Sequence, residues 1–258
     1  MVEKPQMQPP EERPFVVPCA QLSLDAPWRW LRLGWQDFMR APRLSLIFGI
    51  VIMLVSVAVS ALAWSLGRFA LLAALLSGFV FVAPLIAVGL YCVSRELGAG
   101  RTPSLRQSFV LARRVAGQAG IFALAQLVIL LVWSRAGMML SAFFPVDAND
   151  TAMLFEYLAY GSAIGTVFAA LTFATAAVSL PMIADRDVDM ITACISSINA
   201  VLRNKPAMLL WAVLITVLTA VGFATAFVGL VVIMPWLAYA TWYAYRETLQ
   251  PGDWPMLD

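Results

Sequence analysis

Histidine and charged residues are what this chain has least of, and each shortage excludes a class of protein. With no histidine, the chain cannot ligate haem and copper as an oxidase core does, and histidine-based acid–base catalysis is excluded. Charged residues make up 12% of its 258 residues, whereas soluble domains carry about a quarter. This supply cannot cover a water-soluble surface, so we expect a membrane protein.

Paired cysteines, catalytic pairs and a strong net charge are missing as well. Cys19, Cys92 and Cys194 are far apart in the sequence and have neither disulfide nor zinc spacing. No Ser-Lys pair and no glycine-rich phosphate loop is present, and the net charge of +2 gives no reason to expect nucleic acid as a partner. We therefore predict a non-enzymatic protein without cofactor or metal.

Long uncharged runs are abundant. Hydrophobic residues make up 62% of the chain, and a helix needs about 20 apolar residues to cross a bilayer. Since lipid cannot satisfy free backbone groups, spans of this kind are helical. The runs predict an all-α, polytopic membrane protein with six transmembrane helices, at residues 44–66, 69–94, 117–140, 155–184, 207–223 and 226–245.

Lysine and arginine gather on one side of these spans. Only Arg68 and Arg135 lie on the other side, against fifteen in the N-terminal segment, the loops after spans two and four, and the C-terminus. Cytoplasmic loops carry this excess, so we predict cytoplasmic termini and an outer loop at 135–156. The polar, proline-rich residues 1–21 are expected to be a disordered cytoplasmic tail, followed by a membrane domain at 22–250 and a short tail at 251–258.

Three segments on the predicted cytoplasmic side have the periodicity of amphipathic helices: 28–40, 104–116 and 188–203. In the first, Trp28, Leu31, Trp35 and Phe38 form an apolar stripe opposite arginines. Such a helix lies along the inner-leaflet boundary with its arginines near anionic headgroups, or it packs on the ends of the spans. Periodicity leaves both arrangements open.

A repeat divides the membrane domain into three hairpin units, at about 22–100, 101–186 and 187–250. Each unit begins with an amphipathic helix, and its second span carries a proline followed by alanine three residues on, at Pro84, Pro181 and Pro235. The first and third units share a further feature: Arg95-Glu96 and Arg246-Glu247 stand at equal distances from their prolines. The prolines bend their helices, either as hinges around a substrate cleft or, as we favour, as fixed kinks.

Three aspartates at alternate positions, Asp185, Asp187 and Asp189, follow the fourth span. A calcium loop starting at Asp185 needs glycine at its sixth position and glutamate at its twelfth, and the chain has Met190 and Ser196 there. We therefore predict helix capping, with Asp187 as the N-cap and Asp189 in the first turn. A cation or partner contact is the alternative.

The fourth span contains Gly161 and Gly165, which permit close helix approach and favour a central place for this span. Arg135 is the least expected charge, since it falls inside the third span near the outer surface. It is interpreted as an interfacial arginine that reaches outward or pairs with Glu156, and a functional charge is the alternative.

Several segments resemble a known family: "APWRWLRLGWQDF" (26–38), "GLYCVSREL" (89–97), "SLPMIADRDVDMITACISSINAVLRNKP" (179–206) and "PWLAYATWYAYRETL" (235–249). They are similar to the bacterial integral membrane proteins grouped as domain of unknown function 2189, over about residues 20–250. The resemblance implies six spans in a bacterial inner membrane. It implies no activity and assigns no catalytic residues.

Two functions are compatible with this sequence. The first is a non-enzymatic scaffold, assembly or accessory protein that acts on the lipid bilayer or on another membrane protein through its cytoplasmic helices. The alternative is a transporter of a small solute or lipid, with a cleft between proline-kinked spans. A polar cavity reaching the middle of the membrane would favour the second.

Overall fold

The computed structural model describes residues 15–66, 86–143 and 151–257, and these are mostly helical without a named strand. In chain order the helices are α1 (Ala26–Arg40), α2 (Pro42–Leu66), α4 (Leu105–Arg114), α5 (Ala116–Phe143), α6 (Thr151–Ala176), α7 (Ser179–Asp185), α8 (Met190–Arg203), α9 (Lys205–Ala224) and α10 (Leu230–Thr248). Residues 86–98, between α2 and α4, are helical as well. The all-α class predicted from the sequence is confirmed.

Four helices of the described part are long and apolar enough to cross a membrane: Pro42–Leu62, Ala116–Leu140, Met153–Asp185 and Lys205–Ala224. They match the first, third, fourth and fifth predicted spans. Most of the second predicted span, 69–94, lies outside the described residues. The sixth is present as the helix α10, but this helix is not among the four, because its second half contains three tyrosines, Arg246 and Glu247.

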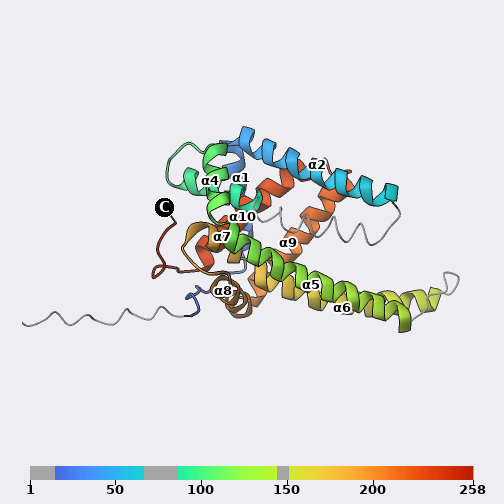
Figure 1. Ribbon diagram of the computed structural model, residues 1–258. Helices are drawn as coiled ribbons and strands as arrows, with labels where there is room; N and C mark the ends of the chain where they lie inside the picture. The colour runs from blue at the N-terminus through green and yellow to red at the C-terminus, as the bar shows by residue number, and fades with distance from the viewer. Residues whose placement is uncertain (1–14, 67–85, 144–150, 258) are drawn as a thin grey trace, which may run out of the picture.

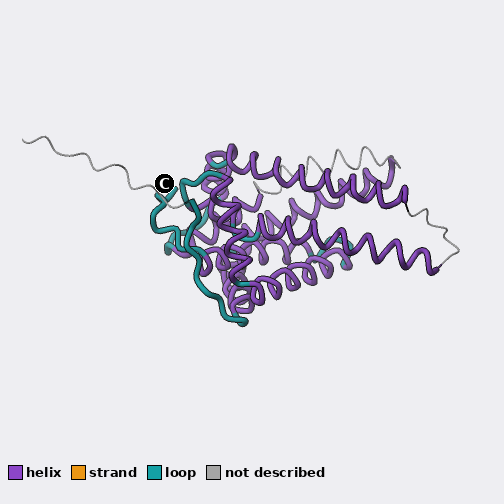
Figure 2. Tube along the Cα trace, turned by 90° about the horizontal axis from the view of Figure 1, so that it is seen from below, coloured by secondary structure: helices purple, strands orange, loops and turns teal. Residues whose placement is uncertain are grey.

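The short helices and loops gather at one end of the molecule, which we call the cap. The cap consists of α1, residues 86–98, α4, α7, α8, the second half of α10 and the tail 249–257. The long helices α2, α5, α6 and α9 extend from it (Figure 1), and most of the described loops lie at this end (Figure 2). The buried core also centres here, around Trp30, Trp211, Tyr239, Tyr245 and Met182.

Helix α10 is the central helix of this arrangement and packs against α1, α2, α7 and α9. Pro235 lies inside it and has no N–H, so the carbonyl of Val231 receives no bond from that position. Gly49 of α2 lies directly against this carbonyl, so closely that a Cβ would overlap it. Gly34 of α1 also faces α10, where a Cβ would come 2.6 Å from the backbone nitrogen of Ala240. Two glycines thus allow α1 and α2 close to α10.

The fourth predicted span differs from expectation in two ways. It is not continuous, because α6 ends at Ala176 and α7 starts at Ser179, with Pro181 in the first turn of α7, where a missing N–H costs little. Its packing is also uneven: no α6 residue with a described side chain is buried, whereas every residue of α7 is buried. Gly161 and Gly165 have only ordinary contacts, with Leu140 and Trp133 of α5. The window of the fourth span, Met153–Asp185, is nevertheless 44% buried, more than that of the other three candidate spans, so its central place stays a prediction.

Candidate functional site

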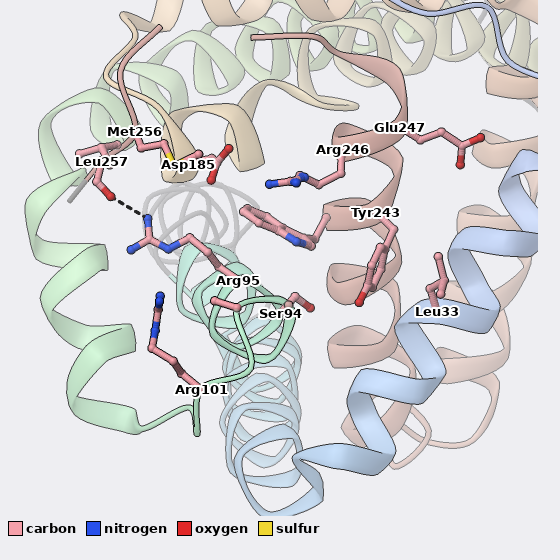
Figure 3. A pocket seen from close by; sticks show the side chains of 13 residues that line it. Leu33, Ser94, Arg95, Arg101, Asp185, Tyr243, Arg246, Glu247, Met256 and Leu257 are labelled. Atoms are coloured by element: carbon pink, nitrogen blue, oxygen red, sulfur yellow. Dashed lines mark hydrogen bonds between the residues drawn. The ribbon is translucent and has the colours of Figure 1, made fainter. Parts of the chain in front are cut away.

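A pocket of about 760 Å³ opens in the cap between α10, residues 86–98 and the C-terminal tail. Figure 3 shows Arg246 extending from α10 toward Asp185, and Arg95 extending from residues 86–98 to the tail. The pocket lies within the size range of small-molecule sites. Its lining residues are Leu33, Ser94, Arg95, Gly98, Ala99, Arg101, Asp185, Trp242, Tyr243, Arg246, Glu247, Met256 and Leu257.

Arg95 is held by backbone carbonyls. Its Nη1 donates to the carbonyl of Leu257 at 3.0 Å, drawn in Figure 3, and to that of Ala184 at 3.4 Å. The side chain is half-buried, and no described carboxylate forms an ion pair with it. A guanidinium has five N–H donors, so most of those of Arg95 have no protein acceptor in the described part of the chain.

Glu96, the neighbour of Arg95, is buried and fully engaged with the loop that precedes α4. It accepts from Arg101 at 2.7 and 2.9 Å, a two-point ion pair, and from the side chain of Gln107 at 3.3 Å. The hydrogen bonds from Arg101 hold the pKa of Glu96 below its ordinary value, although burial opposes them. Glu96 therefore neutralises Arg101.

Glu247 has a corresponding role at the end of α10, where it binds α1. It accepts from Arg29 at 2.5 Å and from the indole N–H of Trp30 at 2.7 Å. Its neighbour Arg246 is exposed, lines the pocket, and makes no hydrogen bond or ion pair with a described residue. Both glutamates of the repeated Arg-Glu pairs thus tie a helix end to an arginine of another segment, and both arginines face the pocket.

The aromatic residues at the seventh position after each proline, Tyr91 and Trp242, also meet. Their rings stack with centroids 6.4 Å apart and an angle of 25° between planes. Corresponding positions of the first and third units are therefore in contact. The equivalence of the two units itself stays a prediction, and Pro84, one of its three anchors, lies outside the described residues.

Asp185 is buried beneath the C-terminal tail. Its Oδ2 accepts from the hydroxyl of Tyr245 at 2.8 Å and from Nε of Arg186 at 3.2 Å, and its carbonyl accepts from the backbone N–H of Leu257 at 3.0 Å. Arg186 in turn donates to the carbonyl of Trp254 at 2.8 Å. The tail is therefore a docked part of the site.

One of the three aspartates does cap the following helix, as predicted, but the capping residue is not the predicted one. Asp189, not Asp187, is the N-cap of α8: its side chain accepts from the backbone N–H of Thr192 at 2.9 Å. Asp187 is exposed, and its backbone N–H donates to Pro255 in the tail. The chain leaves α7 in extended form at Arg186 to meet the tail, which moves the start of α8 two residues on. No group of residues that could hold a metal occurs in the described ranges.

Helix α1 buries a different stripe from the one its periodicity suggested. Leu31 and Phe38 are buried, but Trp28 is 56% exposed and Trp35 41% exposed. The stripe on the protein side instead includes Trp30 and Gly34, because the close contact with α10 occurs at Gly34. The helix docks on the bundle, where Trp35 packs edge-on against Trp236 of α10, and Trp28 is left more exposed.

Sequence reasoning missed a buried carboxylate in this same helix. Asp37 is fully buried, its Oδ2 accepts from the hydroxyl of Tyr243 at 2.9 Å, and its Oδ1 has no hydrogen-bond partner. Burial raises the pKa of Asp37 above its ordinary value. Its spacing from Trp30 and Gly34, at three- and four-residue steps, was the signal for its position on the packed face.

The ion pair suggested between Arg135 and Glu156 does not form. Arg135 of α5 and Glu156 of α6 are both exposed, and no ion pair joins them. The pairing suggested for Arg135 is therefore absent. An arginine that reaches outward from the third span and a functional charge both stay open as interpretations.

These features define an all-helical, multi-pass integral membrane protein with a packed, polar cap. Residues 71–185 match the family described as predicted integral membrane protein (DUF2189), which confirms the predicted resemblance for this part of the chain. The match is shorter than the expected range of about 20–250, and it includes Arg95, Glu96 and Asp185 of the site. No curated protein and no solved structure matches the chain.

Proposed function

We propose that the chain is a six-span protein of a bacterial inner membrane, with the cap and both termini in the cytoplasm. The support is the distribution of lysine and arginine, fifteen on one side against two on the other. Thirteen of the fifteen fall within the described residues, and the segments that carry these thirteen gather at one end in space (Figure 1). In this arrangement the 19-residue helix α10 is the sixth span, and its C-terminal end, with Arg246 and Glu247, lies at the cytoplasmic boundary.

Reporter fusions test this topology. A periplasm-active reporter and a cytoplasm-active reporter, each placed after residue 145 and after residue 258, should give opposite results at the two positions. The same side at both positions would contradict an even number of spans.

Within this topology we propose a non-enzymatic scaffold or accessory protein that acts through its cap. The observation that carries this proposal is the contrast in packing: the buried core centres on the cap, whereas the most apolar window of α2 is only 11% buried and that of α5 only 17%. Two cavities among the long helices have almost wholly apolar linings. The cap also exposes large apolar side chains at Trp28 and Phe109, as an interaction surface does.

Site-specific photo-crosslinking tests this role. A crosslinking residue at position 28 or 109 should give a discrete protein adduct in native membranes, and one at the lipid-facing position 131 should not. Lipid adducts alone at positions 28 and 109 would contradict a protein-scaffold role and leave the cap as a membrane-surface anchor.

A lipid or small-solute transporter is the second candidate. The specific observation in its favour is a cavity of about 340 Å³ lined by residues of α2, 86–98, α9 and α10, next to Pro235. If the kink at Pro235 is a hinge, the protein reconstituted in vesicles should move a fluorescent phospholipid between leaflets, and Pro235→Ala should slow that movement. No movement above that of empty vesicles would reject lipid transport.

A further inference from the structure

We propose that the cap pocket binds a phosphate-bearing amphiphile, with Arg95 and Arg246 as the groups that hold the phosphate. This proposal goes beyond the scaffold role and does not depend on it, because it concerns a ligand of the chain itself. It rests on the charge balance of the pocket, on the way Arg95 is positioned, and on the apolar part of the lining.

Two arginines of the pocket lining are left without an ion pair among the described residues. Among the lining residues, Arg101 is neutralised by Glu96, Asp185 is bound by Arg186 and Tyr245, and Glu247 is bound by Arg29 and Trp30. Arg95 and Arg246 have no carboxylate partner among the described residues. A pocket with two uncompensated guanidinium groups attracts an anion.

Arg95 is also pre-positioned. Its contacts with the carbonyls of Leu257 and Ala184 fix one edge of the guanidinium without cancelling its charge, and leave other donors directed away from these acceptors. A half-buried guanidinium is stabilised by a hydrogen-bonded anion. Phosphate suits this role, because its oxygens accept from the guanidinium fork at two points.

The rest of the lining selects an amphiphile over a bare ion. Leu33, Trp242, Met256 and Leu257 give the pocket a largely apolar wall beside the two arginines. A basic pocket of this composition fits the headgroup and upper chain of an anionic phospholipid. A soluble organic phosphate with an apolar body presents the same chemistry.

The test uses the purified full-length chain in a neutral detergent. Thermal unfolding and native mass spectrometry would be measured with phosphatidylglycerol, with phosphatidylcholine as the zwitterionic control, and with glycerol 1-phosphate as the soluble probe. We expect phosphatidylglycerol to raise the unfolding temperature and to be retained in the spectrometer, and phosphatidylcholine to do neither. Binding of glycerol 1-phosphate with similar effect would show that the apolar wall selects no amphiphile, and would overturn that part of the proposal.

Arg246→Gln is the decisive variant, because Arg246 has no described partner whose loss would unfold the cap. It should weaken phosphatidylglycerol binding by roughly tenfold, the loss of one charge-assisted contact, while the unfolding temperature without lipid stays unchanged. Arg203→Gln, an exposed arginine at the end of α8 that does not line the pocket, is the matched control and should bind as the parent does. Equal weakening by both variants, or no binding of any phosphate by the parent, would overturn the proposal.

Discussion

Helix α10, with its polar second half, and the more uniformly apolar hairpin of α5 and α6 pack in different ways. Ten residues of α10 are buried, and none is buried in α6 among those with described side chains. The glycines of the two regions show the same difference in how closely they are packed. Gly49 and Gly34 are pressed against the backbone of α10, whereas Gly117, Gly120 and Gly137 of α5 have no neighbouring atom within 4 Å of the place where a Cβ would stand.

Side-chain hydrogen bonds occur at the same contacts of α10 as the close-packed glycines. Between α10 and its partners, Ser45 and Tyr239 share a hydrogen bond of 2.9 Å, Trp236 donates to the carbonyl of Leu31 at 2.7 Å, and Tyr243 donates to Asp37. In the hairpin, Gln126 donates to the hydroxyl of Thr175 at 3.0 Å. Lipid is as apolar as leucine, so helices associate in a membrane through close packing and hydrogen bonds. A helix that is hydrophobic but lacks close packing and hydrogen bonds to other helices therefore stays exposed to lipid.

The largest expected effect comes from Trp30. Trp30→Ala removes a fully buried indole that packs edge-on against Trp211 and donates to Glu247, and should lower the free energy of unfolding by about 3–5 kcal/mol. Trp133→Ala in the hairpin, where the indole is 45% exposed, should cost far less. Thermal unfolding in detergent measures both, and equal losses would abolish the distinction between the two regions.

A smaller effect is expected at Gly49. Gly49→Ala forces α2 away from the carbonyl of Val231 and should destabilise the protein by about 1–3 kcal/mol. Gly120→Ala in α5 meets open space and should be neutral or slightly stabilising, because alanine is the better helix former. Chemical denaturation of the two variants measures the difference. A Gly49→Ala protein as stable as the parent would show that the close contact with α10 is not needed.

The N-cap of α8, the helix on which α6 rests, is a third point of comparison. Asp189→Ala should cost about 0.5–2 kcal/mol, Asp189→Asn much less, and Asp187→Ala almost nothing. Burial opposes the charge of Asp189, but the hydrogen bonds from Thr192 outweigh it and lower the pKa. The contribution of Asp189 is therefore present above the ordinary carboxyl pKa and is lost as pH falls through the lowered one. Chemical denaturation at neutral and acid pH would detect both effects, and a larger loss at Asp187 would favour Asp187 as the cap.

The smallest expected effect concerns pH. Because the pKa of Asp37 is raised in the folded protein, the folded state holds this proton more tightly than the unfolded state does. Stability should therefore fall as pH rises above the ordinary carboxyl value of about 4. Asp37→Asn should flatten that part of the pH profile of thermal unfolding. Asp187→Asn, at an exposed aspartate, should leave the profile as it is, and identical profiles for both variants would contradict the assignment.

The class of the protein, the position of most helices and the side on which the charges gather could all be predicted from the amino-acid sequence. These follow from composition and from local periodicity, which act within one segment at a time. The four apolar spans, the helices α1, α4 and α8, and the capping function of the aspartate run were all readable in this way. The family resemblance was readable too, in segments such as 89–97.

Which faces are covered depends on contacts between distant segments. Trp30 and Trp28 are two residues apart in one helix, and only the contact of Gly34 with α10 makes the first a core residue and leaves the second exposed. The N-cap is Asp189 and not Asp187 because the tail 249–257, distant in sequence, pairs with Arg186. The pocket likewise joins residues from five segments. Local patterns cannot supply such contacts, because packing and hydrogen bonding between distant segments depend on where the whole chain places them.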